Sequence, residues 1–186
     1  LNLREHQYFL VSIHREENVD TPQRLSGLMD SLNQLVEEYN IPAIFSVHPR
    51  TKTRLDELQD CNFDSRIKLM KAMGFMDYIQ LQKSAKFVVS DSGTIAEEGS
   101  ILNLPAVTIR QAHERPEGMD EATVIMSGLN KTRVMQAVEI ATKHNLKETR
   151  QIKPVHDYEV DNVSKKVVRI ILSYIDYVNR TVWKKE

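Results

Sequence analysis

The sequence predicts an α/β fold in which helices cover a doubly wound parallel sheet. Short, nearly continuous apolar runs are typical of strands that are buried on both faces, and they alternate with stretches in which apolar residues recur every three or four positions. This alternation at short spacing is the pattern of βαβ units. No internal repeat or low-complexity tract interrupts it, so one domain is the economical interpretation.

The expected strands and helices follow one another along the chain. Strands are expected over residues 8–13, 41–47, 67–70, 86–90, 105–109 and, more weakly, 122–126. Helices are expected over residues 21–36, 54–59, 76–84, 95–102, 131–144 and 162–183. Thr21 would cap the first helix, and Pro22 suits its first turn. Residues 14–18 are expected to form a polar loop, and residues 110–118 a long charged loop with a functional role.

Composition argues against several classes of protein. The chain has 186 residues, a formal net charge of −1, 41% hydrophobic residues and 27% charged residues. These values are typical of a globular protein, and they argue against a general surface for nucleic acid or for an anionic membrane. No apolar run has the roughly 20 residues that a membrane span needs. The single cysteine, Cys61, cannot form an internal disulfide and fits a reducing cytoplasm.

The stretch from Lys86 to Pro105 is the centre of the candidate site. It predicts a buried strand, a polar turn over residues 91–94 and a helix from Ile95. Backbone N–H groups at the positive end of a helix, next to a glycine, suit an anion and above all a phosphate. The turn alone is equally consistent with serine and threonine side chains that only cap the helix.

Four polar clusters follow strands of the predicted sheet, and ligands of such sheets bind at the carboxyl ends of the strands. The clusters are His14-Arg15, His48-Pro49-Arg50, Asp91-Ser92-Gly93-Thr94 and Arg110 through Glu117. Each cluster alone could be a solvated loop. Because all four fall on one edge, and because arginine binds phosphate oxygens in a bidentate manner, together they predict a site for a phosphate-bearing ligand.

Two glutamates lie in the first turn of the helix after the polar turn. Glu97 and Glu98 are favourable there simply because acidic side chains complement the helix dipole. A carboxylate one turn beyond a phosphate site can also accept hydrogen bonds from both hydroxyls of a ribose. Glu98 shares a side of the helix with Ile95 and Leu102, so it points partly inward and is the better candidate.

Several other kinds of site lack their sequence patterns. No G-x-G-x-x-G follows the first strand, and neither a G-x-x-x-x-G-K-[ST] loop nor a G-x-S-x-G nucleophile elbow is present. His14, His48 and His113 do not have the local spacing of metal ligands. Neither a metal nor another cofactor is therefore predicted.

The motifs, taken together, resemble a known family. They are His14-Arg15-Glu16-Glu17-Asn18, then Val47-His48-Pro49, then Ser90 through Glu98, then Arg110 with Glu114-Arg115-Pro116-Glu117. In this order and spacing they resemble the non-hydrolysing UDP-N-acetylglucosamine 2-epimerases over essentially the whole chain. The resemblance implies a glycosyltransferase-B-like enzyme of two Rossmann-like domains. Residues 1–186 look like its C-terminal UDP-binding domain, which would explain a start without methionine, and the N-terminal domain would be missing.

The resemblance implies that several residues contact the UDP-sugar: Arg15, His48, Tyr78, Ser92, Gly93, Thr94, Glu98, Arg115 and Glu117. Ser92 and Gly93 would bind the diphosphate, Glu98 would hold the ribose, and Tyr78 would lie against uracil. His14 would stand beside the diphosphate and the reacting sugar as the catalytic residue of this chain.

The remaining implied contacts lie near the diphosphate and around the sugar. Arg15 and His48 would lie near the diphosphate or near a second, regulatory sugar nucleotide, and Arg115 and Glu117 would shape the sugar side. The implied reaction inverts C2 of the sugar by eliminating UDP to a glycal-like intermediate and adding it back. Its acid and base carboxylates would belong to the missing domain, and the full-length protein would be a homodimer.

Two residues depart from the family pattern. Thr94 stands where a glycine is usual, and His113 stands where threonine is common. With the closing helix, the His113 variant resembles the capsule and O-antigen branch that makes UDP-N-acetyl-L-fucosamine. Three alternatives remain open: a glycosyltransferase of the same fold, which the separate loop over residues 114–117 disfavours, a non-catalytic nucleotide-binding module, and a hydrolytic epimerase that releases UDP.

Overall fold

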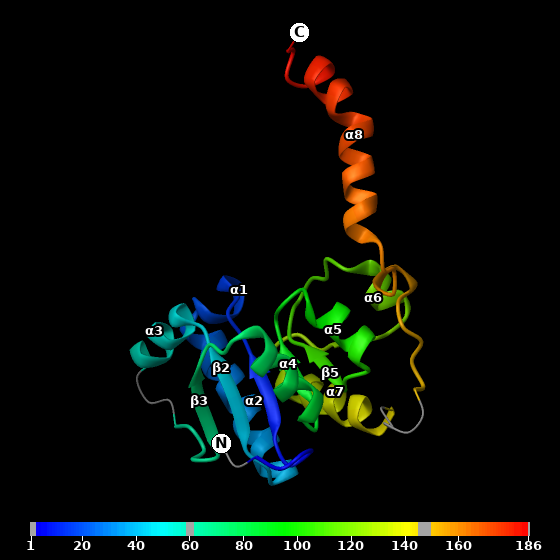
Figure 1. Ribbon diagram of the computed structural model, residues 1–186. Coiled ribbons are helices and arrows are strands. Elements are labelled where there is room, and N and C mark those ends of the chain that lie inside the picture. The colour runs from blue at the N-terminus through cyan, green and yellow to red at the C-terminus, as the bar shows by residue number, and fades with distance from the viewer. Residues whose placement is uncertain (1–2, 59–61, 145–149, 186) are drawn as a thin grey trace. The chain divides into compact units, whose positions relative to one another are not determined.

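The structure, a computed structural model, describes residues 3–58, 62–144 and 150–185. It divides into two compact units, residues 1–155 and residues 156–186. In the described part of the first unit, six strands form one parallel sheet in the order β3-β2-β1-β4-β5-β6 (Figure 1). The prediction of an α/β, Rossmann-like, doubly wound parallel sheet is confirmed.

The strands agree with the predicted ones to within two residues at each end, apart from the last, which begins three residues later. They are β1 (Phe9–Ser12), β2 (Ala43–Val47), β3 (Ile67–Lys71), β4 (Val88–Ser90), β5 (Ala106–Thr108) and β6 (Ile125–Met126). The helices of this unit are α1 (Glu16–Val19), α2 (Pro22–Tyr39), α3 (Pro49–Glu57), α4 (Phe75–Ser84), α5 (Ile95–Leu102), α6 (Pro116–Asp120) and α7 (Lys131–His144).

One helix, α2, continues three residues beyond its predicted end, and three others differ more strongly from the prediction. The helix expected over residues 54–59 begins at Pro49 instead, because the Arg50 N–H donates to His48 Nδ1 at 3.3 Å and proline suits a first turn. Residue 59, its expected end, lies outside the described residues. The other two, α1 and α6, replace parts of the loops expected over residues 14–18 and 110–118. Each is about one turn long, which is too short to produce an apolar periodicity.

The sheet is buried on both faces, as its apolar strands predict. Phe9, Val11 and Phe45 lie on one face in a fully buried cluster with side chains of α2 and α7. Leu10 belongs to the cluster on the other face, which includes side chains of α5. Burial of one such side chain contributes roughly 1.5–3 kcal/mol. The two-sided core therefore holds the strand ends, and the loops that leave them, in fixed positions.

The strand order reverses between β1 and β4. From β1 the chain moves outward through β2 to β3, and it then returns to β4 on the other side of β1. The segments after β1 and β4 lead to helices on opposite faces, so their loops diverge and leave a crevice at the carboxyl ends of the strands. His14-Arg15 and Asp91 through Thr94 stand in these two loops.

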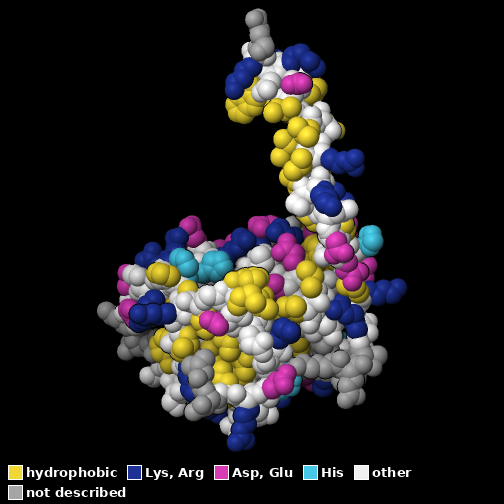
Figure 2. Space-filling model, viewed as in Figure 1, with side chains coloured by type: hydrophobic (Ala, Val, Ile, Leu, Met, Phe, Trp, Pro, Cys, Tyr) yellow, Lys and Arg dark blue, Asp and Glu magenta, His cyan; other side chains and the backbone are white. Residues whose placement is uncertain are grey.

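The second unit consists of a short 3-10 turn (His156–Tyr158) and the helix α8 (Val163–Thr181), which agrees with the prediction to within two residues. None of its described side chains is buried, and its apolar side chains lie along the helix, as Figure 2 shows. Those that are strongly exposed include Val163, Val167, Ile170, Ile171, Leu172, Tyr174 and Tyr177. Of the helices that the structure describes, none combines the length and the apolar character needed to cross a membrane.

Candidate functional site

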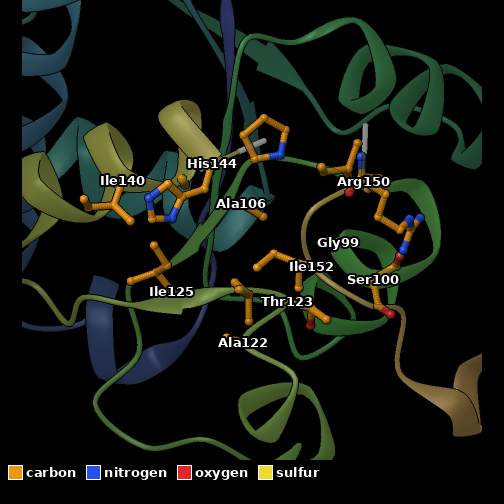
Figure 3. A pocket seen from close by; sticks show the side chains of 15 residues that line it. Gly99, Ser100, Ala106, Ala122, Thr123, Ile125, Ile140, His144, Arg150 and Ile152 are labelled. Carbon is orange, nitrogen blue, oxygen red and sulfur yellow. The ribbon is translucent and has the colours of Figure 1, made fainter. Parts of the chain in front are cut away.

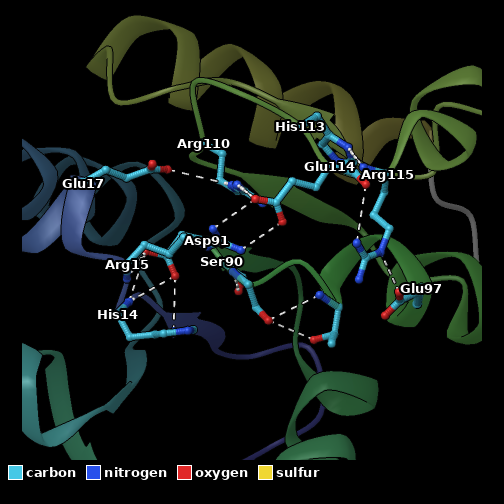
Figure 4. Close-up of polar contacts among 12 residues, drawn as sticks. His14, Arg15, Glu17, Ser90, Asp91, Glu97, Arg110, His113, Glu114 and Arg115 are labelled. Atoms are coloured by element: carbon cyan, nitrogen blue, oxygen red, sulfur yellow. Dashed lines mark hydrogen bonds and ion pairs between the residues drawn. The ribbon is translucent and has the colours of Figure 1, made fainter. Parts of the chain in front are cut away.

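Asp91, the first residue after β4, joins the two loops at the reversal of strand order. Its side chain is fully buried, and its carboxylate accepts the backbone N–H groups of His14 at 3.1 Å and of Arg15 at 2.9 Å (Figure 4). Asn18 Nδ2 donates to the same carboxylate at 3.0 Å, and His14 Nδ1 lies 3.3 Å from it. A buried carboxylate needs such donors. Asp91 therefore fixes the backbone of His14 and Arg15 against β4.

The polar turn itself contains few capping bonds. Ser92 Oγ lies 2.9 Å from Thr94 Oγ1, and the Thr94 N–H donates to Ser92 Oγ at a long 3.4 Å. Thr94 occupies the N-cap position of α5, but its side chain caps no backbone group of the helix. Gly93 N–H has no acceptor among the described residues. The interpretation that these side chains serve only to cap the helix is therefore not favoured.

Two guanidinium groups flank Gly93. A Cβ atom at this position would lie 3.8 Å from Arg115 Nη2 and 3.9 Å from Arg15 Nη2. Arg15 comes from the loop after β1, and Arg115 immediately precedes α6. The two cations therefore converge on a glycine backbone at the start of a helix, which is an arrangement that suits a phosphate.

Glu114 bridges two arginines. Its carboxylate accepts from Arg110 Nη2 at 2.8 Å, and each of its oxygens lies 3.4 Å from an Arg15 nitrogen (Figure 4). Arg110, and to a lesser degree Arg15, lower the pKa of Glu114 to about 2. Arg110 is only 5% exposed, and its Nε has no hydrogen-bond partner among the described residues. Arg110 is thus a buried cation at the edge of the crevice.

Arg115, the second of the two arginines beside Gly93, is held by Glu97 and by a hydrogen bond within its own loop. Arg115 Nε donates to Glu97 Oε1 at 2.7 Å, and the Arg115 N–H donates to His113 Nδ1 at 2.9 Å (Figure 4). Burial, and then the charge of Arg110, lower the pKa of His113, so the ring is neutral at pH 7 and accepts at Nδ1. Glu117 lies in the first turn of α6, where its charge opposes this lowering.

Glu98 faces the opposite side of α5, toward α4. Gln82 Nε2 donates to Glu98 Oε2 at 2.5 Å, and Gln82 itself is 1% exposed. Tyr78 lies one turn earlier on α4, where the side chains of Ser12 and Gln82 are close enough to lower the pKa of its hydroxyl. Burial, with a smaller contribution from the charge of Glu98, raises the pKa of Tyr78 to about 12. Glu98 therefore stands in a polar cluster with an amide and a phenol, and within the described part of the chain no cation forms an ion pair with it.

The two histidines near the crevice lie side by side. The ring centres of His14 and His48 are 6.1 Å apart, and both side chains are exposed. Arg50, by contrast, forms its ion pairs at α1 and not with the histidines. It pairs with Asp20, just after the C-terminal end of α1, at 2.5 Å, and with Glu16 at the start of α1. Arg50 therefore connects α3 to α1 and has a structural role in this arrangement.

The structure thus divides the predicted site residues into three groups. The first group is the turn before α5, formed by Ser92, Gly93 and Thr94, with Arg15 and Arg115 beside it. The second lies between α4 and α5 and consists of Tyr78 and Glu98. The third is the pair of rings beside the loop after β1, His14 and His48. Glu117 is placed near His113 rather than against Gly93. Among the described residues, no group of three or more metal-ligating side chains could hold a metal ion.

The sequence placed Asp91, Arg110 and Glu114 in its polar clusters but gave them no role of their own, and it gave no indication of Gln82. Asp91 and Arg110 carried a signal, because each is a charged residue that directly follows a buried apolar run. Gln82 carried none. On an amphipathic helix a glutamine is read as solvent-facing, and only the packing of α4 against α5 buries it.

A separate pocket of about 180 Å³ lies where α5 and α7 end and β5 and β6 begin (Figure 3). Ala106, Ile125, Ile140 and His144 line it. Arg150, also at its rim, donates to the Ser100 and Ile101 carbonyl oxygens at 2.7 and 3.1 Å. This arginine therefore caps the end of α5, and the pocket is remote from the polar clusters.

Comparison with known proteins identifies the family. Residues 1–172 match the family model described as UDP-N-acetylglucosamine 2-epimerase. The chain is 38% identical over 136 residues to the UDP-N-acetylglucosamine 2-epimerase of Methanocaldococcus jannaschii; this match covers 72% of the chain and 37% of that protein.

Solved structures agree. The UDP-N-acetylglucosamine 2-epimerase from Rickettsia bellii superposes with a TM-score of 0.83 at 49% identity, over 98% of this chain and 48% of that one. The Methanocaldococcus jannaschii enzyme in complex with UDP-GlcNAc and UDP gives a TM-score of 0.77 at 34% identity, over 89% and 45%. The Escherichia coli heptosyltransferase WaaC with ADP, at 18% identity and a TM-score of 0.53, shares the fold alone.

The chain spans less than half the length of each of these relatives. The family model nevertheless matches residues 1–172, which is nearly all of the chain. The chain belongs to the UDP-N-acetylglucosamine 2-epimerase family.

Proposed function

We propose that this chain is the C-terminal, UDP-binding domain of a sugar-nucleotide 2-epimerase, which inverts C2 of a UDP-N-acetylhexosamine. The observation that carries the proposal is the convergence of Arg15 and Arg115 on Gly93 at the start of α5. It is supported by the relative from Methanocaldococcus jannaschii, whose structure holds UDP-GlcNAc and UDP. The reaction eliminates UDP from the sugar and adds it back to the glycal-like intermediate.

The site favours this reaction because it holds the leaving group. A diphosphate between the two guanidinium groups and the Gly93 N–H would have its developing charge stabilised as the bond to the sugar breaks. The same contacts would keep UDP in place for its return, so that the addition step has the rate advantage of a bound partner. Ser92 and Thr94 add hydroxyl groups at this position.

The neighbouring side chains would contact the ribose, the uracil and the sugar of the nucleotide. Glu98 would accept hydrogen bonds from the ribose hydroxyls, and Tyr78, on the adjacent helix, would lie near the uracil. His14 is held by Asp91 beside the diphosphate site and would act on the leaving group or the sugar. Arg115 and Glu117 would border the sugar, and His48 would lie beside His14 or contact a second nucleotide.

The complete enzyme requires more protein than this chain contains. The acid and base carboxylates that transfer the C2 proton would stand on an N-terminal domain, consistent with matches that cover 37% and 48% of two relatives. The exposed apolar side of α8 would dock on that domain, because an amphipathic helix of 19 residues needs a partner for its apolar face. The whole enzyme would be a cytoplasmic homodimer that supplies capsule, O-antigen or other surface polysaccharides, with UDP-N-acetyl-L-fucosamine as one product.

UDP binding tests the first part of this proposal. Calorimetry on the 186-residue protein is expected to detect binding of UDP, weakened at least tenfold by Arg15→Ala because a cation at the diphosphate is lost. Lys52→Ala removes a cation that pairs with Asp56 on the exposed side of α3, and it should leave the affinity unchanged. Absence of UDP binding would contradict the proposal.

Proton exchange tests the second part. A full-length epimerase in deuterated water should incorporate deuterium at C2 of its UDP-sugar, whereas a glycosyltransferase of the same fold should not. The fold shared with a heptosyltransferase is the observation that makes this alternative worth testing. Transfer of the sugar without exchange at C2 would favour the transferase.

A further inference from the structure

Gln82 is a buried amide on the inner face of α4. Its Nε2 donates to Glu98 Oε2 at 2.5 Å, while its Oε1 has no hydrogen-bond partner among the described residues. A buried amide oxygen without a partner is unfavourable, and an apolar side chain of similar volume would avoid it. The burial of an amide here is therefore best explained by the hydrogen bond that it donates to Glu98.

An amide and a cation would have different effects on a carboxylate. Arg115 pairs with Glu97 at 2.7 Å and neutralises its charge. An amide donates one hydrogen bond, orients the carboxylate, and leaves its negative charge in place for other donors. Glu98 therefore keeps its second oxygen, Oε1, for hydroxyl groups of a ligand, in an orientation that Gln82 restricts.

Gln82 and Tyr78 form the wall that faces Glu98. They are four residues apart on α4 and therefore lie on one side of the helix. Gln82 and Ser12 both lower the pKa of Tyr78, which indicates that they lie close to its hydroxyl. Gln82 is nearly free of solvent contact. Its side chain consequently has little freedom to turn away from Glu98.

We propose that Gln82 is a positioning residue that holds Glu98 ready to accept hydrogen bonds from a vicinal diol, and that it thereby sets the preference of the site for ribonucleotides. This inference rests on the proposed function, since a nucleoside diphosphate must bind at the turn before α5. Gln82 touches no part of the ligand itself, and its effect passes through Glu98.

The experiment compares the affinities of UDP and 2′,3′-dideoxy-UDP, which lacks both ribose hydroxyls. Calorimetry is done on the 186-residue protein and on Gln82→Met, Glu98→Gln and the double variant. The unchanged protein should prefer UDP by about tenfold or more, as expected for hydrogen bonds to a charged group. Gln82→Met should bind dideoxy-UDP within about twofold of the unchanged protein and should reduce the preference for UDP at least threefold.

Three further measurements separate positioning from general damage. The double variant should show no smaller preference than Glu98→Gln alone, because Gln82 acts through Glu98. The melting temperature of Gln82→Met should be unchanged or higher, since the variant removes an unsatisfied oxygen. Gln80→Met is the matched control: Gln80 is exposed on the same helix and donates to Ser84 Oγ, and its replacement should leave the preference unchanged.

The outcomes distinguish this inference from the function on which it rests. An unaltered preference in Gln82→Met, or an equal loss of affinity for both nucleotides, would overturn the role of Gln82 while UDP binding stands. UDP binding without preference over the dideoxy nucleotide would also overturn it. Failure of the unchanged protein to bind UDP would overturn the proposed function and this inference together.

Discussion

Glu97 and Glu98 are adjacent in the sequence, yet the two sides of α5 give them different environments. On the side of α6, Glu97 pairs with Arg115, and Glu114, the residue before Arg115, pairs with Arg110, so each carboxylate meets a cation. On the side of α4, Glu98 meets the neutral amide of Gln82. In the first region each carboxylate has a cationic partner, whereas Glu98 forms no ion pair with any residue that the structure describes.

This difference indicates which part of a nucleotide each side can bind. A phosphate brings negative charge and competes with Glu97 and Glu114 for their arginines. A ribose brings hydroxyl donors, which an unpaired carboxylate accepts. Replacing a glutamate on one side of α5 should therefore have the opposite effect on affinity from replacing its neighbour on the other side. That contrast, and the anchoring of Arg15 by the buried Asp91 on which its arginine side depends, can be tested by substitution.

Asp91→Ala is expected to have the largest effect. It removes the acceptor for the His14 and Arg15 N–H groups and for Asn18, and each buried donor left without a partner is unfavourable by about 1–3 kcal/mol. The free energy of unfolding should fall by roughly 3 kcal/mol, measured by urea denaturation. Asp91→Asn, which keeps an acceptor oxygen, should lose less. Equal stability of the alanine variant and the unchanged protein would contradict the anchoring role.

Glu98→Ala should lower the affinity for UDP by about 10- to 100-fold, because hydrogen bonds from the ribose to a charged acceptor contribute about 1.5–3 kcal/mol. Titration calorimetry gives the ratio. Inorganic pyrophosphate serves as the control ligand, since it has no ribose and its binding should change little. A variant that binds UDP as tightly as the unchanged protein would remove Glu98 from the site.

Glu97→Gln should raise the affinity for UDP by about two- to fivefold. It removes a negative charge close to the diphosphate and releases Arg115 from its partly exposed ion pair, and such pairs contribute about 0–1 kcal/mol. The gain should shrink in high salt, where charges are screened. If Glu97→Gln weakened UDP binding as strongly as Glu98→Ala, the contrast between the two sides of α5 would be lost.

The pKa of Glu114 should report directly on its arginines. A carboxyl whose pKa is lowered on folding stabilises the native state above its unfolded pKa of about 4.5, and the contribution is lost as the pH falls toward about 2. Arg110→Gln should raise the pKa more than Arg15→Gln, because Arg110 is the larger cause. Carbon-detected NMR of the Glu114 carboxyl measures both shifts, and the reverse order would contradict this arrangement.

Much of the candidate site could be predicted because its residues follow strands. The carboxyl ends of parallel strands lie at one edge, so clusters at His14, His48, Asp91 and Arg110 had to fall near one another once the strands were identified. Their partners could not be predicted in the same way. The pairing of Glu97 with Arg115, and of Glu98 with Gln82, depends on how two helices rotate about their axes, which periodicity alone does not specify.

The sequence by itself determined the alternation of strands and helices, because burial on two faces requires apolar runs and burial on one face requires apolar residues at helical spacing. It indicated α2 and α8 equally well from that spacing. Only the tertiary structure decided that the apolar side of α2 lies in the core and that of α8 remains exposed. An amphipathic pattern specifies one apolar face of a helix, whereas the surface that covers it comes from distant parts of the chain or from another domain. The same holds for Gln82, which is polar in sequence and buried because α4 packs beside α5.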